Sequence, residues 1–205
     1  MANRVGSQGG ARAISVARTG LEQAFLLATA VLLVALLFGL ASAADPAPTG
    51  GCKVNGARKQ LCQGGPGSDH IIGTKGNDII NGGGGNDRIR ARSGDDIVSG
   101  GEGNDSIDGG DGADTIDGGP GNDRLAGDDD DDVILGGEGK DTLIGKNGND
   151  DLDGGPDDDR LRGNGDDDTL QGGTGNRDLL QGGGGDGDWC DDVDGSRRAI
   201  RCELP

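Results

Sequence analysis

The chain has 205 residues, 46 of them glycine, and its 37 acidic against 19 basic residues give a formal net charge of -18 at pH 7. Both phenylalanines lie near the N-terminus, and Trp189 is the only aromatic residue after them. This composition excludes a conventional globular core, and the charge disfavours nucleic acid and anionic membranes as partners. We expect the partners of such a chain to be cations.

Residues 1–43 have the layout of a secretory signal peptide. Three arginines and one acid, Glu22, precede an uncharged apolar run from Ala24 to Leu40, and Ala41-Ser42-Ala43 then gives a small-x-small signal. The alternative is an uncleaved anchor, because the run approaches the ~20 residues that span a bilayer. Gly39 and the small residues after it favour cleavage after Ala43. Cleavage there would leave a secreted chain of net charge -20 without a membrane contact.

Residues 64–171 divide into twelve consecutive blocks of nine residues with no gap. The sixth residue of every block is aspartate, and the eighth is aliphatic, from Ile71 to Leu170. A period this regular predicts a solenoid, and it argues against the disorder that the composition alone would indicate. The twelve aspartates are Asp69, Asp78, Asp87, Asp96, Asp105, Asp114, Asp123, Asp132, Asp141, Asp150, Asp159 and Asp168.

Each block can be written Gly-Gly-x-Gly-x-Asp-x-U-x, where U is aliphatic. Glycines at positions one, two and four permit positive backbone dihedrals, so the first six residues can form a tight turn with inward carbonyls. The last three residues form a short strand whose middle side chain points inward. Two blocks then make one coil, and aspartates 18 residues apart stack in two rows. Because carboxylates and carbonyls are the hard ligands that Ca²⁺ takes, we predict that these aspartates bind calcium.

Clean copies of the block, such as Gly100–Asp108 and Gly118–Ala126, resemble the RTX (hemolysin-type) calcium-binding nonapeptide repeat family. The resemblance implies an all-β fold, a right-handed parallel β-roll with calcium held between the turns of successive coils. Because the inward aliphatic residues are few, we predict that the calcium-free chain is largely unfolded, and that calcium binding and folding are one event.

Some blocks depart from the pattern. Ala91-Arg92 replaces the first two glycines of one block, and Asp128–Asp132 is an unbroken acidic run that is either a solvated edge or a tighter calcium site. Aspartate tolerates the left-handed region better than most residues, so we expect the turns to survive where it replaces glycine. It takes the fourth position at Asp130, Asp157 and Asp166.

After Gln171, the segments Gly172–Gln181 and Gly182–Asp191 keep the pattern if each contains one extra turn residue. Asp178 and Asp188 then take the aspartate position, and the aliphatic position falls to Leu180 and Cys190. We expect these degenerate blocks to cap the solenoid. The expected organisation is a signal peptide (1–43), an N-terminal cap (44–63), twelve repeats (64–171) and a C-terminal cap (172–205).

The four cysteines form two local pairs, Cys52 with Cys62 and Cys190 with Cys202. In an exported chain, an even number of cysteines predicts disulfides that close both ends of the roll. Trp189 is expected to cover the C-terminal opening. A zinc site is disfavoured, because neither pair has close metal-ligand spacing and the chain has one histidine.

The sequence predicts no enzyme. Outside the repeats little chain remains, and it contains no Gly-x-Ser-x-Gly or His-Glu-x-x-His motif. We therefore expect a secreted, monomeric protein that binds calcium ions. The alternative is an extracellular adhesin or surface-interaction solenoid whose outer face binds another partner.

Overall fold

The computed structural model of the chain describes residues 61–175, 177–191 and 202. The predicted signal peptide and most of the predicted N-terminal cap, including Cys52, lie outside this part. The described residues form strands and turns, and no helix among them is long and apolar enough to cross a membrane.

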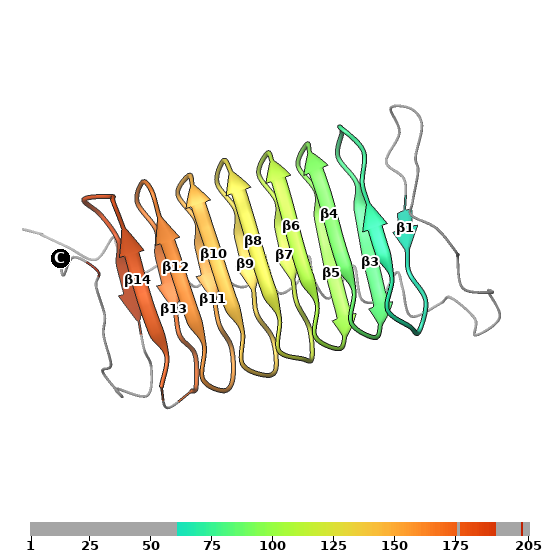
Figure 1. Ribbon diagram of the computed structural model, residues 1–205. Coiled ribbons are helices and arrows are strands. Elements are labelled where there is room, and N and C mark those ends of the chain that lie inside the picture. The colour runs from blue at the N-terminus through green and yellow to red at the C-terminus, as the bar shows by residue number, and fades with distance from the viewer. Residues whose placement is uncertain (1–60, 176, 192–201, 203–205) are drawn as a thin grey trace, which may run out of the picture. The chain divides into compact units, whose positions relative to one another are not determined.

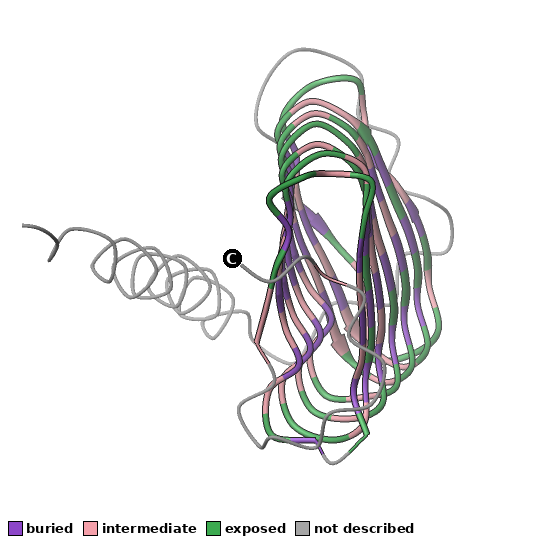
Figure 2. Ribbon diagram, turned by 90° about the vertical axis from the view of Figure 1, so that its left-hand side faces the viewer, coloured by how far each residue is buried: buried purple, intermediate pink, exposed green. Residues whose placement is uncertain are grey.

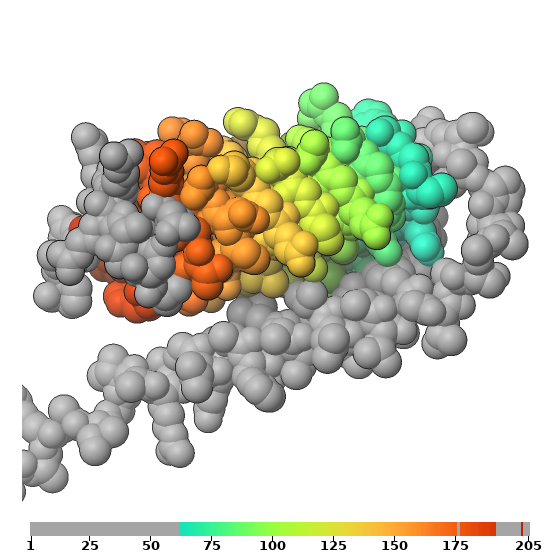
Figure 3. Space-filling model, turned by 90° about the horizontal axis from the view of Figure 1, so that it is seen from below, coloured from blue at the N-terminus to red at the C-terminus, as the bar shows by residue number. Residues whose placement is uncertain are grey.

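The strands form two parallel sheets that alternate along the chain. Each coil contributes one strand to each sheet, and the coils follow one another as neighbouring bands (Figures 1 and 3). The eight-stranded sheet contains, in order, β1 (Leu61–Gln63), β3 (Ile79–Gly84), β5 (Ile97–Glu102), β7 (Thr115–Asp117), β9 (Val133–Leu135), β11 (Asp151–Asp153), β13 (Thr169–Gln171) and β15 (Trp189–Asp191). The seven-stranded sheet contains β2 (His70–Ile72), β4 (Arg88–Ser93), β6 (Ser106–Asp111), β8 (Arg124–Asp129), β10 (Thr142–Asn147), β12 (Arg160–Asn164) and β14 (Leu179–Gly183).

The register confirms two blocks to a coil. Ile80 pairs with Val98, and Ile89 with Ile107, so each strand lies beside the strand 18 residues away. The aliphatic residues of the blocks, from Ile71 to Leu180, form a buried cluster. Buried segments recur along the strands of successive coils (Figure 2). Cys62 extends this core at one end, as its place in the pattern predicts. The chain is therefore the parallel β-roll that the repeat implied.

Several strands are longer than the expected three residues. Six strands have six residues each, because the strand continues into the first three residues of the next block. They are β3, β4, β5, β6, β8 and β10. In β3 the burial alternates so that both Ile80 and Gly82 face inward. The first residue of each block is thus a second inward position, which the sequence analysis did not assign.

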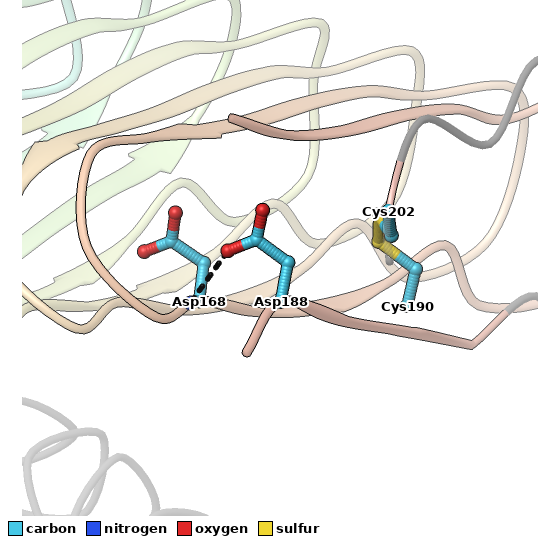
Figure 4. The surroundings of a disulfide bond; sticks show 4 residues. All are labelled: Asp168, Asp188, Cys190 and Cys202. Atoms are coloured by element: carbon cyan, nitrogen blue, oxygen red, sulfur yellow. Dashed lines mark hydrogen bonds between the residues drawn. A yellow bond between two sulfur atoms is a disulfide. The ribbon is translucent and has the colours of Figure 1, made fainter. Parts of the chain in front are cut away.

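The two ten-residue blocks keep the predicted pattern at the C-terminal end of the described repeats. Leu161 pairs with Leu180 at a separation of 19 residues, and Leu170 pairs with Cys190 at a separation of 20. Cys190 forms a disulfide with Cys202 beside the last aspartates of one row (Figure 4). Cys62 is also disulfide-bonded, while its predicted partner lies outside the described residues.

The expectation that Trp189 covers the C-terminal opening is wrong. Trp189 pairs with Thr169 at an outward position of the eight-stranded sheet and is 44% exposed. The reason is the alternation of side chains along a strand, because Cys190 takes the inward position and its neighbour must point outward.

Candidate metal centre

The block aspartates form two continuous rows inside the roll. In each row the Oδ1 atom of one aspartate accepts a hydrogen bond from the main-chain N–H of the aspartate one coil earlier, at 2.6 to 3.1 Å. The last such bond runs from Asp168 to Asp188 (Figure 4). One row contains Asp69, Asp87, Asp105, Asp123, Asp141, Asp159 and Asp178, and the other contains Asp78, Asp96, Asp114, Asp132, Asp150, Asp168 and Asp188.

These rows contain the twelve predicted aspartates and extend each row by one. Asp178 and Asp188 occupy the same position despite the longer blocks, which places them with the predicted set. All except Asp69, which is half-buried, are buried, with 1 to 4% of each residue exposed. Carboxylates are seldom buried without a charged partner, so this arrangement suits a row of cations.

The second carboxylate oxygen is the unusual feature of the rows. From Asp87 to Asp168, ten aspartates have a buried Oδ2 atom that has no hydrogen-bond partner in the described part of the chain. Leaving a buried acceptor unpaired costs roughly 1 to 3 kcal/mol, and more when the group is charged. Ten such atoms in register indicate a ligand that recurs with the coils.

Position one, which is glycine in every block except that of Ala91, makes room for this oxygen. A Cβ atom built on Gly136 would lie 2.6 Å from Asp141 Oδ2 and 2.5 Å from the carbonyl oxygen of Gly154, one coil further on. The expectation that this glycine serves a positive dihedral is wrong, because positive φ occurs at positions two and four and not at position one. A carboxylate oxygen and a carbonyl oxygen therefore face the same space, with no side chain between them.

From the block of Gly82 to that of Gly163, positions two and four lie in the left-handed region, including where the residue is not glycine. Arg92 and Lys146 hold position two with φ of 99° and 101°. The predicted survival of the turns is confirmed, because the three aspartates at position four also have positive φ, at 82° for Asp157 and lower for Asp130 and Asp166.

The acidic run Asp128–Asp132 is mostly surface. Asp129, Asp130 and Asp131 are exposed, and Asp128 forms an ion pair with Lys146 one coil away. Only Asp132 belongs to a buried row. This placement favours the solvated edge.

Burial raises the pKa of ten of the row carboxyl groups above the ordinary value of 3.8. Desolvation is the largest cause, the main-chain hydrogen bond opposes it, and nearby carboxylates raise the pKa further for most of them. The pKa rises to about 6 for Asp96, Asp105 and Asp150, to about 7 for Asp114, Asp123 and Asp168, and to about 8 for Asp132 and Asp159. It is also raised for Asp87 and Asp141.

A polar ladder at position five was missed by the sequence analysis. Asn104 N–H donates to Asn86 Oδ1 at 2.8 Å, and Asn122 N–H donates to Asn104 Oδ1 at 2.7 Å. On the other edge Asp131 Oδ1 accepts from Asn149 in the same way. The sequence contains a signal for this ladder, which is the recurrence of asparagine or aspartate immediately before the row aspartate. These residues satisfy the turn backbone and leave the buried oxygens unpaired.

The donor set fits a hard cation held between coils. No group of three or more His, Cys, Asp or Glu side chains converges in the described part of the chain. A carboxylate from one coil and a carbonyl from the next are both hard oxygen ligands, which Ca²⁺ prefers and which zinc sites seldom use alone.

The comparisons with known proteins agree with this chemistry. The family described as RTX calcium-binding nonapeptide repeat matches the chain in four copies, at residues 63–98, 90–125, 117–152 and 144–177. Together the copies span more than half of the chain. No curated protein matches it.

Proposed function

Because the chain belongs to the RTX calcium-binding nonapeptide repeat family, we propose that it is a secreted protein whose roll binds calcium along both aspartate rows and folds as it does so. The observation that carries the proposal is the series of ten buried Oδ2 atoms without a hydrogen-bond partner in the described residues. A bound calcium ion would supply positive charge and a coordination partner for each of these oxygens.

The residues of the roll divide the task. The row aspartates, from Asp69 to Asp168 and with Asp178 and Asp188 added, would provide the carboxylates. From Asp87 onward, the Oδ1 atom of each row aspartate accepts a hydrogen bond from a main-chain N–H group, which fixes the direction of these carboxylates. The first glycine of each block leaves the Oδ2 side open. Without a cation, the stacked carboxylates repel one another in a buried setting, which supports coupling between binding and folding.

Two observations support export. Residues 1–43 have the order of a secretory signal peptide. The Cys190–Cys202 disulfide is typical of proteins from oxidising compartments. We further propose that the chain is not an enzyme, since its only histidine, His70, is exposed on β2 and no nucleophile motif accompanies it.

A calcium titration followed by circular dichroism tests the central claim. We expect a cooperative gain of strand signal with calcium, no comparable gain with magnesium, and reversal by a chelator. Magnesium is a strict control because it favours octahedral sites that keep water ligands. Equal strand signal in calcium and in chelator would show that folding does not depend on the metal.

A further inference from the structure

The outward face of the seven-stranded sheet is basic, although the whole chain is strongly acidic. Six exposed arginines and one exposed lysine, Lys146, lie at its outward strand positions, and we call it the arginine face. The arginines are Arg88, Arg90, Arg92, Arg124, Arg160 and Arg162. Two carboxylates also lie at outward positions of these strands: Asp108, which pairs with Arg90, and Asp128, which pairs with Lys146. In a chain of net charge -18, such a reversal of sign needs an explanation.

Three of these arginines form a regular ladder. The strand register places Arg88, Ser106, Arg124, Thr142 and Arg160 side by side on successive strands. Arginines therefore alternate with hydroxyl residues. With neighbouring strands ~4.8 Å apart, the arginines recur about every 10 Å along the roll.

The ladder arginines have no ion-pair partner among the residues that the structure describes. Only Arg90 has a carboxylate, Asp108 at 3.3 Å, among the ion pairs of the described residues. Arg88, Arg124 and Arg160 are exposed and make no ion pair in that part of the chain. A planar guanidinium binds carboxylate or sulfate groups through two parallel hydrogen bonds, so these side chains are free to bind an external anion.

The surroundings limit the width of what can bind. The eight-stranded sheet has Asp117, Asp151 and Asp153 at outward positions and no basic residue among its described ones. Exposed acids also line both turn edges, for example Glu102 and Glu138 on one. The arginine face is thus a narrow positive strip between acidic borders, which suits a thin chain that crosses the strands.

We propose that the arginine face is a docking surface for one linear anionic polysaccharide with sparse carboxylate or sulfate groups. The polymer would lie along the roll, with its anionic groups on the ladder arginines and its hydroxyls near Ser106 and Thr142. The inference rests on the proposed function, because calcium-dependent folding would assemble the ladder from residues 72 positions apart in the sequence.

Other occupants fit less well. A nucleic acid has a much denser charge, and Trp189, the only aromatic residue available for base stacking outside the N-terminal segment, is on the other sheet. A membrane is broad enough to meet the acidic borders. A second copy could place its acidic sheet here, but seven strands of three to six residues cover at most roughly 670 Å², below the ~800 Å² per partner of a stable interface.

The test measures binding of the full purified chain to immobilised hyaluronan, which has one carboxylate in each disaccharide. It is run in about 1 mM calcium, the range of extracellular sites. The ladder variant is Arg88→Gln/Arg124→Gln/Arg160→Gln. The control variant, Lys75→Gln/Lys140→Gln/Arg177→Gln, removes the same charge from exposed residues of the turns, outside the strands of the sheet. Circular dichroism with and without calcium is recorded for each protein.

We expect the wild type and the control variant to bind hyaluronan, and the ladder variant to bind about ten-fold more weakly or worse. Equal weakening of both variants, no binding by the folded wild type, or equal binding to uncharged dextran would overturn the inference. Stronger binding to polydeoxythymidine or to phosphatidylserine vesicles, or a stable dimer, would replace the polysaccharide by that partner. A strand signal that does not change with calcium would instead count against the proposed function. The ladder and control variants would still test the arginine ladder.

Discussion

At the scale of single residues, the first and second glycines of a block have different roles. Position two accepts Arg92, Lys146 and Asn164 with positive φ, whereas position one holds glycine or, once, Ala91. The sequence pattern already showed this difference. A position that excludes every side chain larger than that of alanine is limited by space and not by its dihedral angles. The dihedral argument explained position two and could not explain position one, where the neighbouring carboxylate takes the space of a Cβ atom.

Replacement of Asp141 by asparagine should have opposite effects with and without calcium. Asparagine keeps an oxygen to accept the N–H of Asp123, and its amide group can donate toward the carbonyl of Gly154. The Asp141→Asn variant should therefore bind calcium more weakly and, in chelator, shift the equilibrium between unfolded and folded chain toward the folded state by about 1 kcal/mol. Calcium titration and the strand signal of circular dichroism in chelator measure the two effects.

The matched control for this variant is Glu138→Gln, in the same block but exposed. It removes the same charge and should change both quantities little, because exposed charges interact weakly. Equal losses of calcium affinity in the two variants would mean that net charge, and not the buried row, determines binding.

Arg92 offers a test of backbone strain. Its φ of 99° lies in a region that favours glycine, so Arg92→Gly should stabilise the calcium-loaded roll by about 1 kcal/mol. Arg88, on the same strand β4, lacks a positive φ, and Arg88→Gly should destabilise the roll by roughly 0.5 to 1 kcal/mol. Thermal unfolding in saturating calcium measures both. The same sign for both variants would contradict the strain argument.

At the scale of elements, the period of nine predicted the order, direction and register of the strands. It could do so because the aliphatic residue at position eight is the only large inward side chain in a block. Strand length was less predictable. A longer strand is recognised in a sequence by alternating apolar and polar side chains. The inward residue at position one is usually glycine, which has no side chain, so this alternation is not visible there.

The aspartate rows predict an unusual dependence on pH. Their pKa values rise on folding, to about 6 for Asp105, about 7 for Asp123 and about 8 for Asp132. A raised pKa means that the folded state binds more protons, so this contribution is complete below about pH 4 and is lost as pH rises through about 6 to 8. Without calcium, acidification from about pH 8 to about pH 5 should therefore increase strand content.

Circular dichroism of metal-free protein across this range measures the effect. The calcium-loaded protein is the control, and its affinity for calcium should fall over the same interval, because protons and the cation compete for the carboxylates. Loss of strand signal on acidification of the metal-free chain would contradict the burial of these groups.

At the scale of the whole molecule, the sequence identified the family, the roll and the C-terminal disulfide, and it did not identify the arginine face. Each of the ladder arginines is a single variable residue at position seven of its block. They form a group only when coils of 18 residues bring every second block to the same sheet, since the other sheet has Ile79, Ile97 and Asp151 at this position. Sorting variable residues by sheet would have revealed the difference.

The disulfide cap should act locally, because a solenoid is stabilised mainly by contacts between neighbouring coils. Cys190 holds the last inward position and pairs with Leu170, so the bond to Cys202 prevents the final coil from fraying. The Cys190→Ser/Cys202→Ser variant, in calcium, should lose hydrogen-exchange protection at β13, β14 and β15 while β5 and β6 keep theirs. The loss should approach about 3 kcal/mol at the end coil, the typical contribution of a short disulfide loop. Uniform loss of protection along the roll would show that the coils unfold as one unit, and the aspartate rows would then have to transmit the effect of the cap from end to end.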